Sequence, residues 1–185
     1  MRVSLMTDDY GEYLHYGAPL TLVTTLDRDG KINVATNAST LPLPGSTPRL
    51  AIGVLKDNLT NQLIAQSGEF VVNLLTSEMR GIAKLCGEHS GDSIDKLKLS
   101  GLSTEPAQHV KAPIITECPM SIECAVEYTQ ALGDIDLFVA RILAVSVAPG
   151  WSNGHGEMNL DAFDPLLYAF GHTFRRGSEV GRGSI

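Results

Sequence analysis

Apolar residues recur along this chain in two patterns, and each pattern predicts one kind of element. Short runs rich in branched residues predict strands over 20–26, 49–55 and 69–75. Apolar residues at helical spacing predict a helix over 59–67 that stops at Ser67-Gly68, and a second helix that opens at Ser77-Glu78 and ends at Gly87. The chain therefore alternates short strands with a few helices.

The stretch 17–39 predicts a hairpin that ends in polar side chains. Asp27-Arg28-Asp29-Gly30 supplies the turn after strand 20–26, with Gly30 free to adopt a positive φ. Residues 31–36 form the return strand. Amides and hydroxyls follow within a few positions, at Asn33, Thr36, Asn37, Ser39 and Thr40. Such a cluster is a plausible place to hold a polar, planar ligand.

The remaining pattern predicts a mainly β fold. The segments 120–129 and 134–148 are long and apolar and predict a second antiparallel hairpin. We predict a proline-rich turn over 41–45. The segment 89–103 is predicted to be mostly loop, with a short helix near 94–97. About six strands with two or three inserted helices favour a β-barrel with α insertions on its rim. We expect one domain over 1–185, with a core of about 12–174 and a polar tail at 177–185. No G-x-G-x-x-G follows a strand, which disfavours a doubly wound fold.

Composition and charge exclude several classes of partner. The chain is 43% hydrophobic and 19% charged, as in ordinary globular proteins, and its net charge of -7 argues against nucleic acid or an anionic membrane. We find no signal peptide in residues 1–10 and no run of roughly 18 apolar residues. Cys86, Cys118 and Cys124 form a sparse, odd set typical of reduced thiols, which favours the cytoplasm. Neither their spacing nor His155 with Glu157 predicts a metal site.

An ordered series of motifs carries a family resemblance. The pieces are Asp27-x-Asp29-Gly30-x-x-Asn33, Lys56-Asp57-Asn58-Leu59-Thr60, Cys86-Gly87-x-x-Ser90-Gly91-x-x-x-Asp95-Lys96, Gly133-Asp134-x-x-Leu137-Phe138 and Pro165-Leu166-Leu167-Tyr168. Over roughly 17–174 the chain resembles the flavin reductase-like, FMN-binding split-barrel proteins, including flavoredoxins. The resemblance implies an antiparallel Greek-key split barrel. It also implies a homodimer with one FMN per subunit near the interface, which passes hydride or single electrons through the flavin.

The resemblance also implies the residues that would hold FMN. Lys56, Asn58 and Thr60 stand where a strand turns into a helix and would contact the phosphate; the alternative is that Asn58 or Thr60 only caps the helix. Lys96 would neutralise the phosphate or lie near the pyrimidine edge. The residues expected at the isoalloxazine or the phosphate are Asn33, Thr36, Asn37, Ala38, Ser39 and Thr40, and Tyr168 would pack on the flavin. The alternative is that Thr36, Asn37 and Ser39 satisfy a barrel edge or turn and that Tyr168 belongs to the core. No catalytic side chain is required, because the redox chemistry belongs to the flavin.

Two positions depart from the family pattern. Ile135 stands where many relatives carry His near the flavin, and Ser39 stands where several carry Trp. The expected function is an oxidoreductase that passes electrons from NAD(P)H or a protein donor through FMN to a second acceptor. The Ile135 departure motivates an alternative, a non-catalytic electron carrier without a nicotinamide site. A split barrel holding another ligand, such as haem or a deazaflavin, is a third reading. Whether Cys86 or His172 acts at the site stays open.

Overall fold

A computed structural model describes residues 17–152 and 157–177 of the chain. The segment 1–16, His155 and the predicted polar tail after residue 177 lie outside the described residues. No helix in the described ranges is long and apolar enough to cross a membrane.

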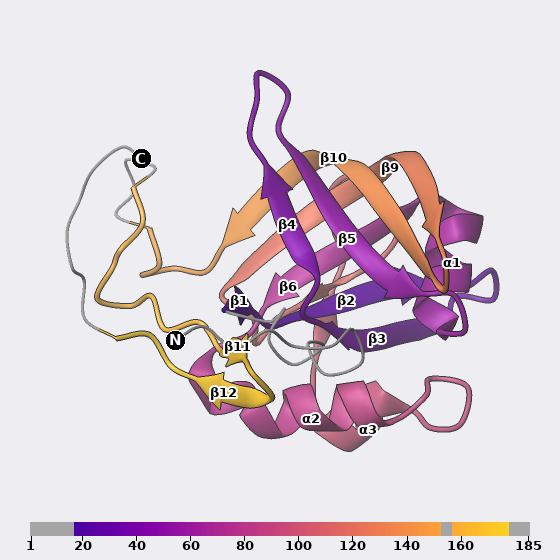
Figure 1. Ribbon diagram of the computed structural model, residues 1–185. Helices are drawn as coiled ribbons and strands as arrows, with labels where there is room; N and C mark the ends of the chain where they lie inside the picture. Colours follow the sequence, from indigo (N-terminus) through magenta and orange to yellow (C-terminus); the bar gives the residue numbers. More distant parts are fainter. Residues whose placement is uncertain (1–16, 153–156, 178–185) are drawn as a thin grey trace, which may run out of the picture.

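One curled antiparallel sheet forms the body of the protein (Figure 1). Its strand order is β3-β2-β6-β9-β10-β5-β4. The strands are β2 (Thr21–Leu26), β3 (Ile32–Asn37), β4 (Thr40–Leu43), β5 (Arg49–Leu55), β6 (Glu69–Leu74), β9 (Met120–Leu132) and β10 (Ile135–Val147). The edge strands β3 and β4 are consecutive in the chain, so the sheet curls back on itself at this seam. This confirms the predicted mainly β, antiparallel barrel.

Side-chain and backbone bonds hold the seam between the two edges. Asn37 Nδ2 donates to the Gly53 carbonyl (2.9 Å), and the Gly53 N–H donates to the Ser39 carbonyl (3.1 Å). Asn37 Oδ1 accepts from the Ser39 N–H (2.7 Å) and from Thr40 Oγ1 (3.0 Å). The polar cluster predicted after β3 therefore forms a defined turn against β5.

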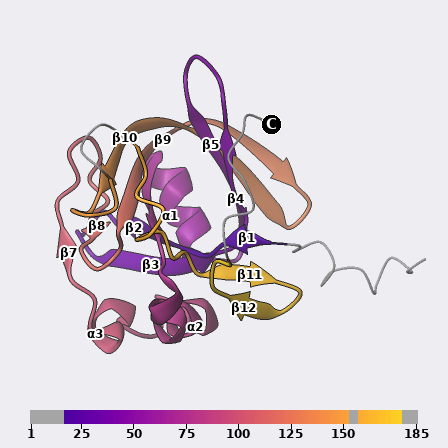
Figure 2. The same cartoon turned by 90° about the vertical axis from the view of Figure 1, so that its left-hand side faces the viewer.

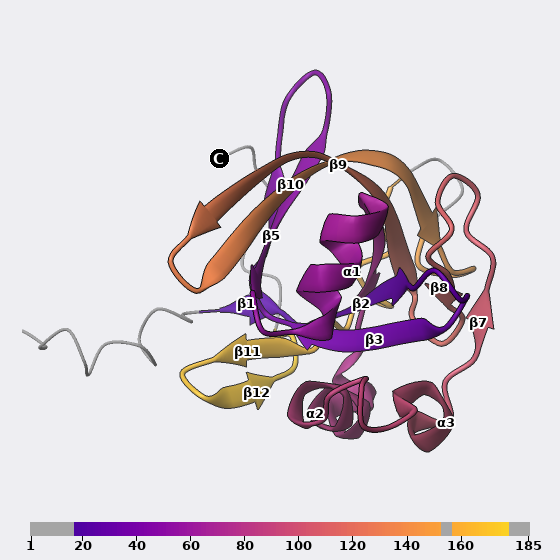
Figure 3. The same cartoon turned by 90° about the vertical axis from the view of Figure 1, so that its right-hand side faces the viewer.

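Helices lie on both sides of β3. Helix α1 (Leu59–Ser67) lies in the concave side of the curled sheet (Figure 3), where Ile64 packs in a buried cluster with Val23, Phe70 and Phe138. Helix α2 (Arg80–Glu88), which follows a 3-10 turn at Ser77–Met79, and helix α3 (Lys96–Ser100) lie outside the barrel below β3 (Figure 1). Strand β3 therefore separates α1 from α2.

Two small sheets complete the described fold. Strands β1 (Ala18–Pro19), β11 (Leu167–Ala169) and β12 (His172–Phe174) form one, and β7 (Thr104–Glu105) and β8 (Ile114–Ile115) form the other. The β11–β12 hairpin lies beside α2 (Figure 2), where Arg80 Nε donates to Thr173 Oγ1 at 2.9 Å. These short pairs add to the six strands that the sequence predicts, because two- or three-residue strands carry no periodicity to detect.

Most predicted elements are confirmed, and one is wrong. The first turn forms as expected: Asp27 Oδ1 accepts from the Asp29 and Lys31 N–H groups, and Gly30 has a φ of 83°. Residues 41–45, predicted as a turn, instead contribute to strand β4. Pro42 is tolerated there because β4 is an edge strand that pairs only with β5, so its missing N–H breaks no ladder.

Candidate functional site

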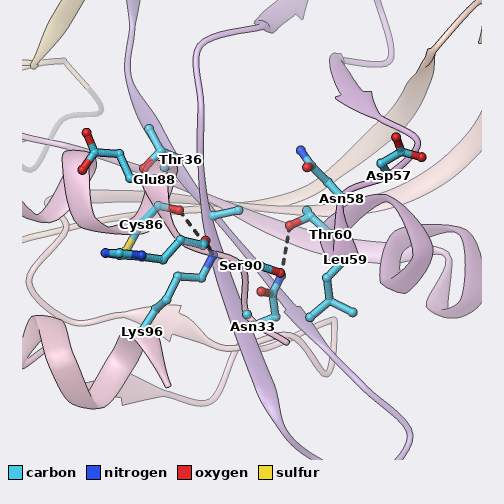
Figure 4. A pocket seen from close by; sticks show the side chains of 14 residues that line it. Asn33, Thr36, Asp57, Asn58, Leu59, Thr60, Cys86, Glu88, Ser90 and Lys96 are labelled. Carbon is cyan, nitrogen blue, oxygen red and sulfur yellow. Dashed lines mark hydrogen bonds between the residues drawn. The ribbon is translucent and has the colours of Figure 1, made fainter. Parts of the chain in front are cut away.

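Three pockets meet at the end of β3. The α1 pocket, of about 280 Å³, lies between β3, the start of α1 and the segment after α2 (Figure 4). The β5 pocket, of about 210 Å³, is lined by Ser39, Gly53 and Ile135 among others. The α2 pocket, of about 540 Å³, lies between β3, α2 and the β11–β12 hairpin. Thr36 lines all three pockets, so they adjoin one another at this residue.

The side chains of β3 alternate between the side of α1 and the side of α2, so one strand contributes residues to both. Asn33 and Asn37 direct their amides toward α1 and β5, whereas Val34 packs in the cluster beneath α2. Thr36 shares the side of Val34 and donates from Oγ1 to the Ala83 carbonyl of α2 at 2.7 Å. Successive side chains of a strand point to opposite faces, so this arrangement follows from the register of β3 alone.

The start of α1 is open for a ligand. Asn58 is the N-cap residue in an extended conformation, yet its side chain makes no capping hydrogen bond. The backbone N–H groups of Leu59 and Thr60 make no hydrogen bond within the described part of the chain. Asn58, Leu59 and Thr60 all line the α1 pocket. Free N–H groups and the positive end of the helix dipole favour an anion there.

Asn33, which lines the same pocket, has a buried polar atom without a partner among the described residues. It is 6% exposed, and its Nδ2 donates to Thr25 Oγ1 (3.1 Å) and Thr60 Oγ1 (3.0 Å). Its Oδ1 has no hydrogen-bond partner among the described residues. A Cβ at Gly91 would lie 2.3 Å from that oxygen, so only glycine allows the chain to pass so close. A buried acceptor without a donor costs about 1–3 kcal/mol, which a ligand N–H or O–H would offset.

Lys96 places a buried cation at the other side of the α1 pocket. The residue is 5% exposed, and its Nζ donates to the carbonyls of Cys86 (3.3 Å) and His89 (3.1 Å). No carboxylate pairs with it among the ion pairs of the described residues. Burial lowers the pKa of Lys96, although the nearby Cys86 and Asp92 oppose the shift. A buried ammonium without a carboxylate favours an anionic ligand.

Cys86 lines the same pocket but is not poised to react. It is buried in the cluster with Met79 and Ala83, as the apolar stripe of α2 predicts. Burial raises the pKa of the Cys86 thiol, and Lys96 only partly opposes this. The thiol is therefore protonated at neutral pH, which makes it a poor nucleophile.

Comparison with known proteins now identifies the family. The chain matches the flavin reductase like domain over residues 13–177. It belongs to this family. Flavoredoxin of Desulfovibrio vulgaris (Miyazaki F) superposes with a TM-score of 0.88 at 26% identity, covering 98% of this chain and 97% of that one. Flavoredoxin from Methanosarcina acetivorans superposes with a TM-score of 0.86 at 26% identity, covering 98% and 95%.

A further relative carries a named activity. The NADH:riboflavin 5'-phosphate oxidoreductase of Streptomyces pristinaespiralis is 24% identical over 120 residues, 65% of each chain. The family match and this relative support a flavin-linked oxidoreductase. The family match and the solved structures confirm the resemblance and the split-barrel class that the sequence predicts.

The structure brings most of the predicted flavin-binding residues together. Five of them line the α1 pocket: Asn33, Thr36, Asn58, Thr60 and Lys96. Residues 37–39 line the β5 pocket, and Tyr168 lines the α2 pocket. Residues from five separate elements or loops of this family member therefore converge at Thr36.

Two predicted residues have other partners. Lys56 Nζ donates to the Gly133 carbonyl (2.6 Å) and lies 3.8 Å from an oxygen of Asp136, and it lines none of the three pockets. Thr40 lines none of them either and bonds to Asn37 and Thr21. Direct contact of Lys56 or Thr40 with a flavin stays a prediction.

Residues outside the predicted set also line the site. The segment 87–91 contributes to the α1 pocket, and Arg80 with Lys84 contributes to the α2 pocket. For the segment 87–91, the sequence signal was the pair Gly87 and Gly91, because a close approach of the backbone to another group needs glycine. No local signal marks Arg80 or Lys84, because surface cations on a helix usually face solvent.

Proposed function

We propose that this protein is an FMN-binding oxidoreductase that passes electrons from NAD(P)H or a redox-protein donor through the flavin to a second acceptor. One observation carries the proposal. Four residues that line the α1 pocket offer the buried Lys96 ammonium, the N–H groups of Leu59 and Thr60, and Asn33 Oδ1; among the described residues these N–H groups and this oxygen have no hydrogen-bond partner. A cation and free N–H groups suit a phosphate, and an unpaired acceptor suits a hydroxyl or ring N–H.

The residues present fit FMN. Thr60 and Lys96 would hold the phosphate, and Asn33 would accept a hydrogen bond from the ligand. Thr36, Ala38 and Ser39 line the adjoining space where a flat ring would lie, with Tyr168 beyond Ala38. The small α1 pocket, bounded by one buried cation, favours a single terminal phosphate and hence FMN over a dinucleotide. Bound flavin supplies hydride and one-electron transfer.

An exposed apolar face lies beside the β5 pocket. Ile135 pairs in register with Leu55 of β5 and Leu132 of β9, so the three side chains share one face. They are 37%, 47% and 52% exposed. Adjacent exposed apolar side chains on three strands are typical of a contact surface. We propose a homodimer that covers this face, with the flavin near the interface.

Ile135 also supports an electron-carrier function as the second candidate. It lies at the β5 pocket beside Gly53, with its Cγ2 3.6 Å from where a Cβ would stand on Gly53. An isoleucine offers no hydrogen bond to a nicotinamide or to a reduced ring. A protein donor that reaches the flavin edge requires no such bond. The NADH-linked Streptomyces relative favours the first candidate.

The spectrum of the purified protein and one titration test these proposals. We expect absorption maxima of bound flavin, or uptake of one FMN per chain on addition. Anaerobic NADH or NADPH should bleach that flavin. If a reduced protein donor bleaches it and neither nicotinamide does, NAD(P)H is rejected as the donor and the electron carrier without a nicotinamide site is supported. If no flavin is present or taken up, both candidates are wrong.

A further inference from the structure

We infer that the α2 pocket binds the second reactant, a planar ring that carries a carboxylate or phosphate. At about 540 Å³ it is larger than the α1 pocket or the β5 pocket, and it opens on the same residues, Thr36 and Ala38. A ligand there would border the space proposed for the flavin and would share Thr36, Ala38 and Tyr168 with it. That this ligand is a reactant rests on the proposed function, whereas its binding to the α2 pocket does not.

The walls of the α2 pocket suit a ring. Leu20, Ala38, Ala83 and Tyr168 line it, and together they form an apolar surface between β3 and the β11–β12 hairpin. Leu20 and Ala83 belong to the buried core, so this wall has fixed positions. Apolar pockets with a few placed polar groups are the usual form of a small-molecule site.

Arg80 supplies the anion-binding group. Its Nε donates to Thr173 Oγ1 (2.9 Å), which orients the guanidinium against the hairpin. Among the ion pairs of the described residues it has no carboxylate partner. Both terminal nitrogens are therefore available to a carboxylate or phosphate, and Arg binds either in a bidentate fork.

Lys84 adds a second, weaker positive charge. It lies four residues after Arg80 on α2, so both side chains stand on one side of the helix and line the pocket. Its Nζ is 3.8 Å from an oxygen of Glu88, which also lines the pocket, and both side chains are largely exposed. Glu88 offsets much of this charge, which leaves Arg80 as the principal contact. In a chain of net charge -7, a net positive pocket favours an anion locally.

Calorimetric titration of the full chain tests the inference with three probes. 2-Naphthoate carries a ring and a carboxylate, nicotinamide mononucleotide carries a ring and a phosphate, and 2-naphthylmethanol carries a ring without charge. We expect at least one anionic probe to bind, and the neutral alcohol to bind at least about tenfold more weakly. Binding of the nucleotide alone would indicate a nicotinamide donor, and binding of naphthoate alone would indicate an aromatic acid.

Variants locate the binding. Arg80→Gln should weaken the anionic probe by about tenfold or more and Lys84→Gln by less, with partial recovery in Arg80→Lys. Lys98→Gln, an exposed lysine of α3 outside the pocket, is the matched control and should change nothing. Because Arg80 is an exposed residue, these variants should fold, which circular dichroism checks.

Several outcomes would overturn the inference. They are no binding of any anionic probe, equal binding of the neutral alcohol, or an unchanged affinity in Arg80→Gln. Displacement of an anionic probe by FMN would also overturn it, since the pocket would then belong to the cofactor. Titrations run with and without FMN keep the two proposals separate. If the protein takes up no FMN, the proposed flavin function is rejected, and the probe titrations still show whether the α2 pocket binds a ring with an anionic group.

Discussion

At the scale of single residues, the site is defined by buried polar groups whose charge or hydrogen bonding the described residues leave incomplete. Among the described residues, Lys96 is a buried cation without a carboxylate, and Asn33 Oδ1 is a buried acceptor without a donor. Such groups reduce stability unless a ligand completes them. Their positions around one pocket therefore describe the ligand: an anion at one end and a hydrogen-bond donor near Asn33.

Replacing Lys96 tests the phosphate contact. Lys96→Gln should weaken FMN binding by about 10- to 100-fold, because a charge-assisted hydrogen bond is lost. Fluorescence titration measures both FMN and riboflavin, which lacks the phosphate. Riboflavin affinity should change little, and Lys98→Gln should leave both affinities intact. An equal loss for FMN and riboflavin would place Lys96 at the ring instead.

The pH dependence of FMN binding reports the same residue. Burial lowers the pKa of Lys96, so its charge is lost at a lower pH than that of an ordinary lysine. Below this pKa the ammonium holds the phosphate; as pH rises through it, FMN affinity should fall. FMN titrations at increasing pH should show this fall in the native protein and not in Lys96→Gln. An identical profile in both would contradict the assignment.

Gly91 tests the close approach at Asn33. In Gly91→Ala the new methyl would meet Asn33 Oδ1 at 2.3 Å and Leu59 Cδ2 at 3.1 Å. We expect a loss of about 1–3 kcal/mol in the free energy of unfolding, together with weaker FMN binding. Gly81→Ala in α2 is the matched control, since nothing lies within 4 Å and its helical position favours alanine. Urea unfolding should show Gly81→Ala equal to or more stable than the native chain.

At the scale of elements, β3 organises the site because its two faces contact different helices. Its position depends on β2 and β6, which the buried Asn73 ties to distant segments. Asn73 Nδ2 donates to the Leu22 carbonyl (3.1 Å) and Thr24 Oγ1 (3.3 Å). Its Oδ1 accepts from the Ile115 N–H (3.0 Å) and Ser121 Oγ (2.8 Å). One amide thus joins four strands.

Removing that amide should loosen the barrel. Asn73→Leu removes the acceptor of the buried Ile115 N–H and of Ser121 Oγ and a donor to the Leu22 carbonyl, so we expect a loss of about 3 kcal/mol or more in the free energy of unfolding. Ser121→Ala removes one bond of the set and should cost about 1 kcal/mol. Denaturant titration followed by circular dichroism measures both. A loss in Asn73→Leu no larger than that in Ser121→Ala would show that the network is not the main support of β6.

At the scale of the whole molecule, the apolar face of Leu55, Leu132 and Ile135 gives the protein an unpartnered surface beside the β5 pocket. A dimer over this face would close that pocket on its open side. The proposed flavin would then lie between two copies of the chain, away from bulk water.

A charge on this apolar face tests the dimer. Leu132→Lys should convert a dimer into a monomer and weaken FMN binding, because a charge cannot be buried there without a partner. Leu99→Lys, on the exposed surface of α3, is the matched control and should keep the native mass. Light scattering with size-exclusion chromatography gives the mass. A native chain that is already monomeric would reject the proposed interface.

The sequence by itself determined the elements and the family. Helix 59–67 and strand 49–55 match the structure to the residue, because periodicity, branched residues and Gly68 act locally. The ordered motifs were sufficient to indicate a flavin-binding split barrel, which the comparison confirms. Local signals failed at Pro42, whose place on an edge strand depends on how the sheet closes.

Only the tertiary structure decided which polar residues face the site. Lys56 and Lys96 look equally available in the sequence, yet Lys56 is engaged by Gly133 and Asp136 whereas Lys96 is buried in the α1 pocket. Arg80 carries no sequence signal and reaches the α2 pocket because the β11–β12 hairpin lies beside α2. Burial and charge pairing depend on contacts between distant segments, which no local pattern encodes.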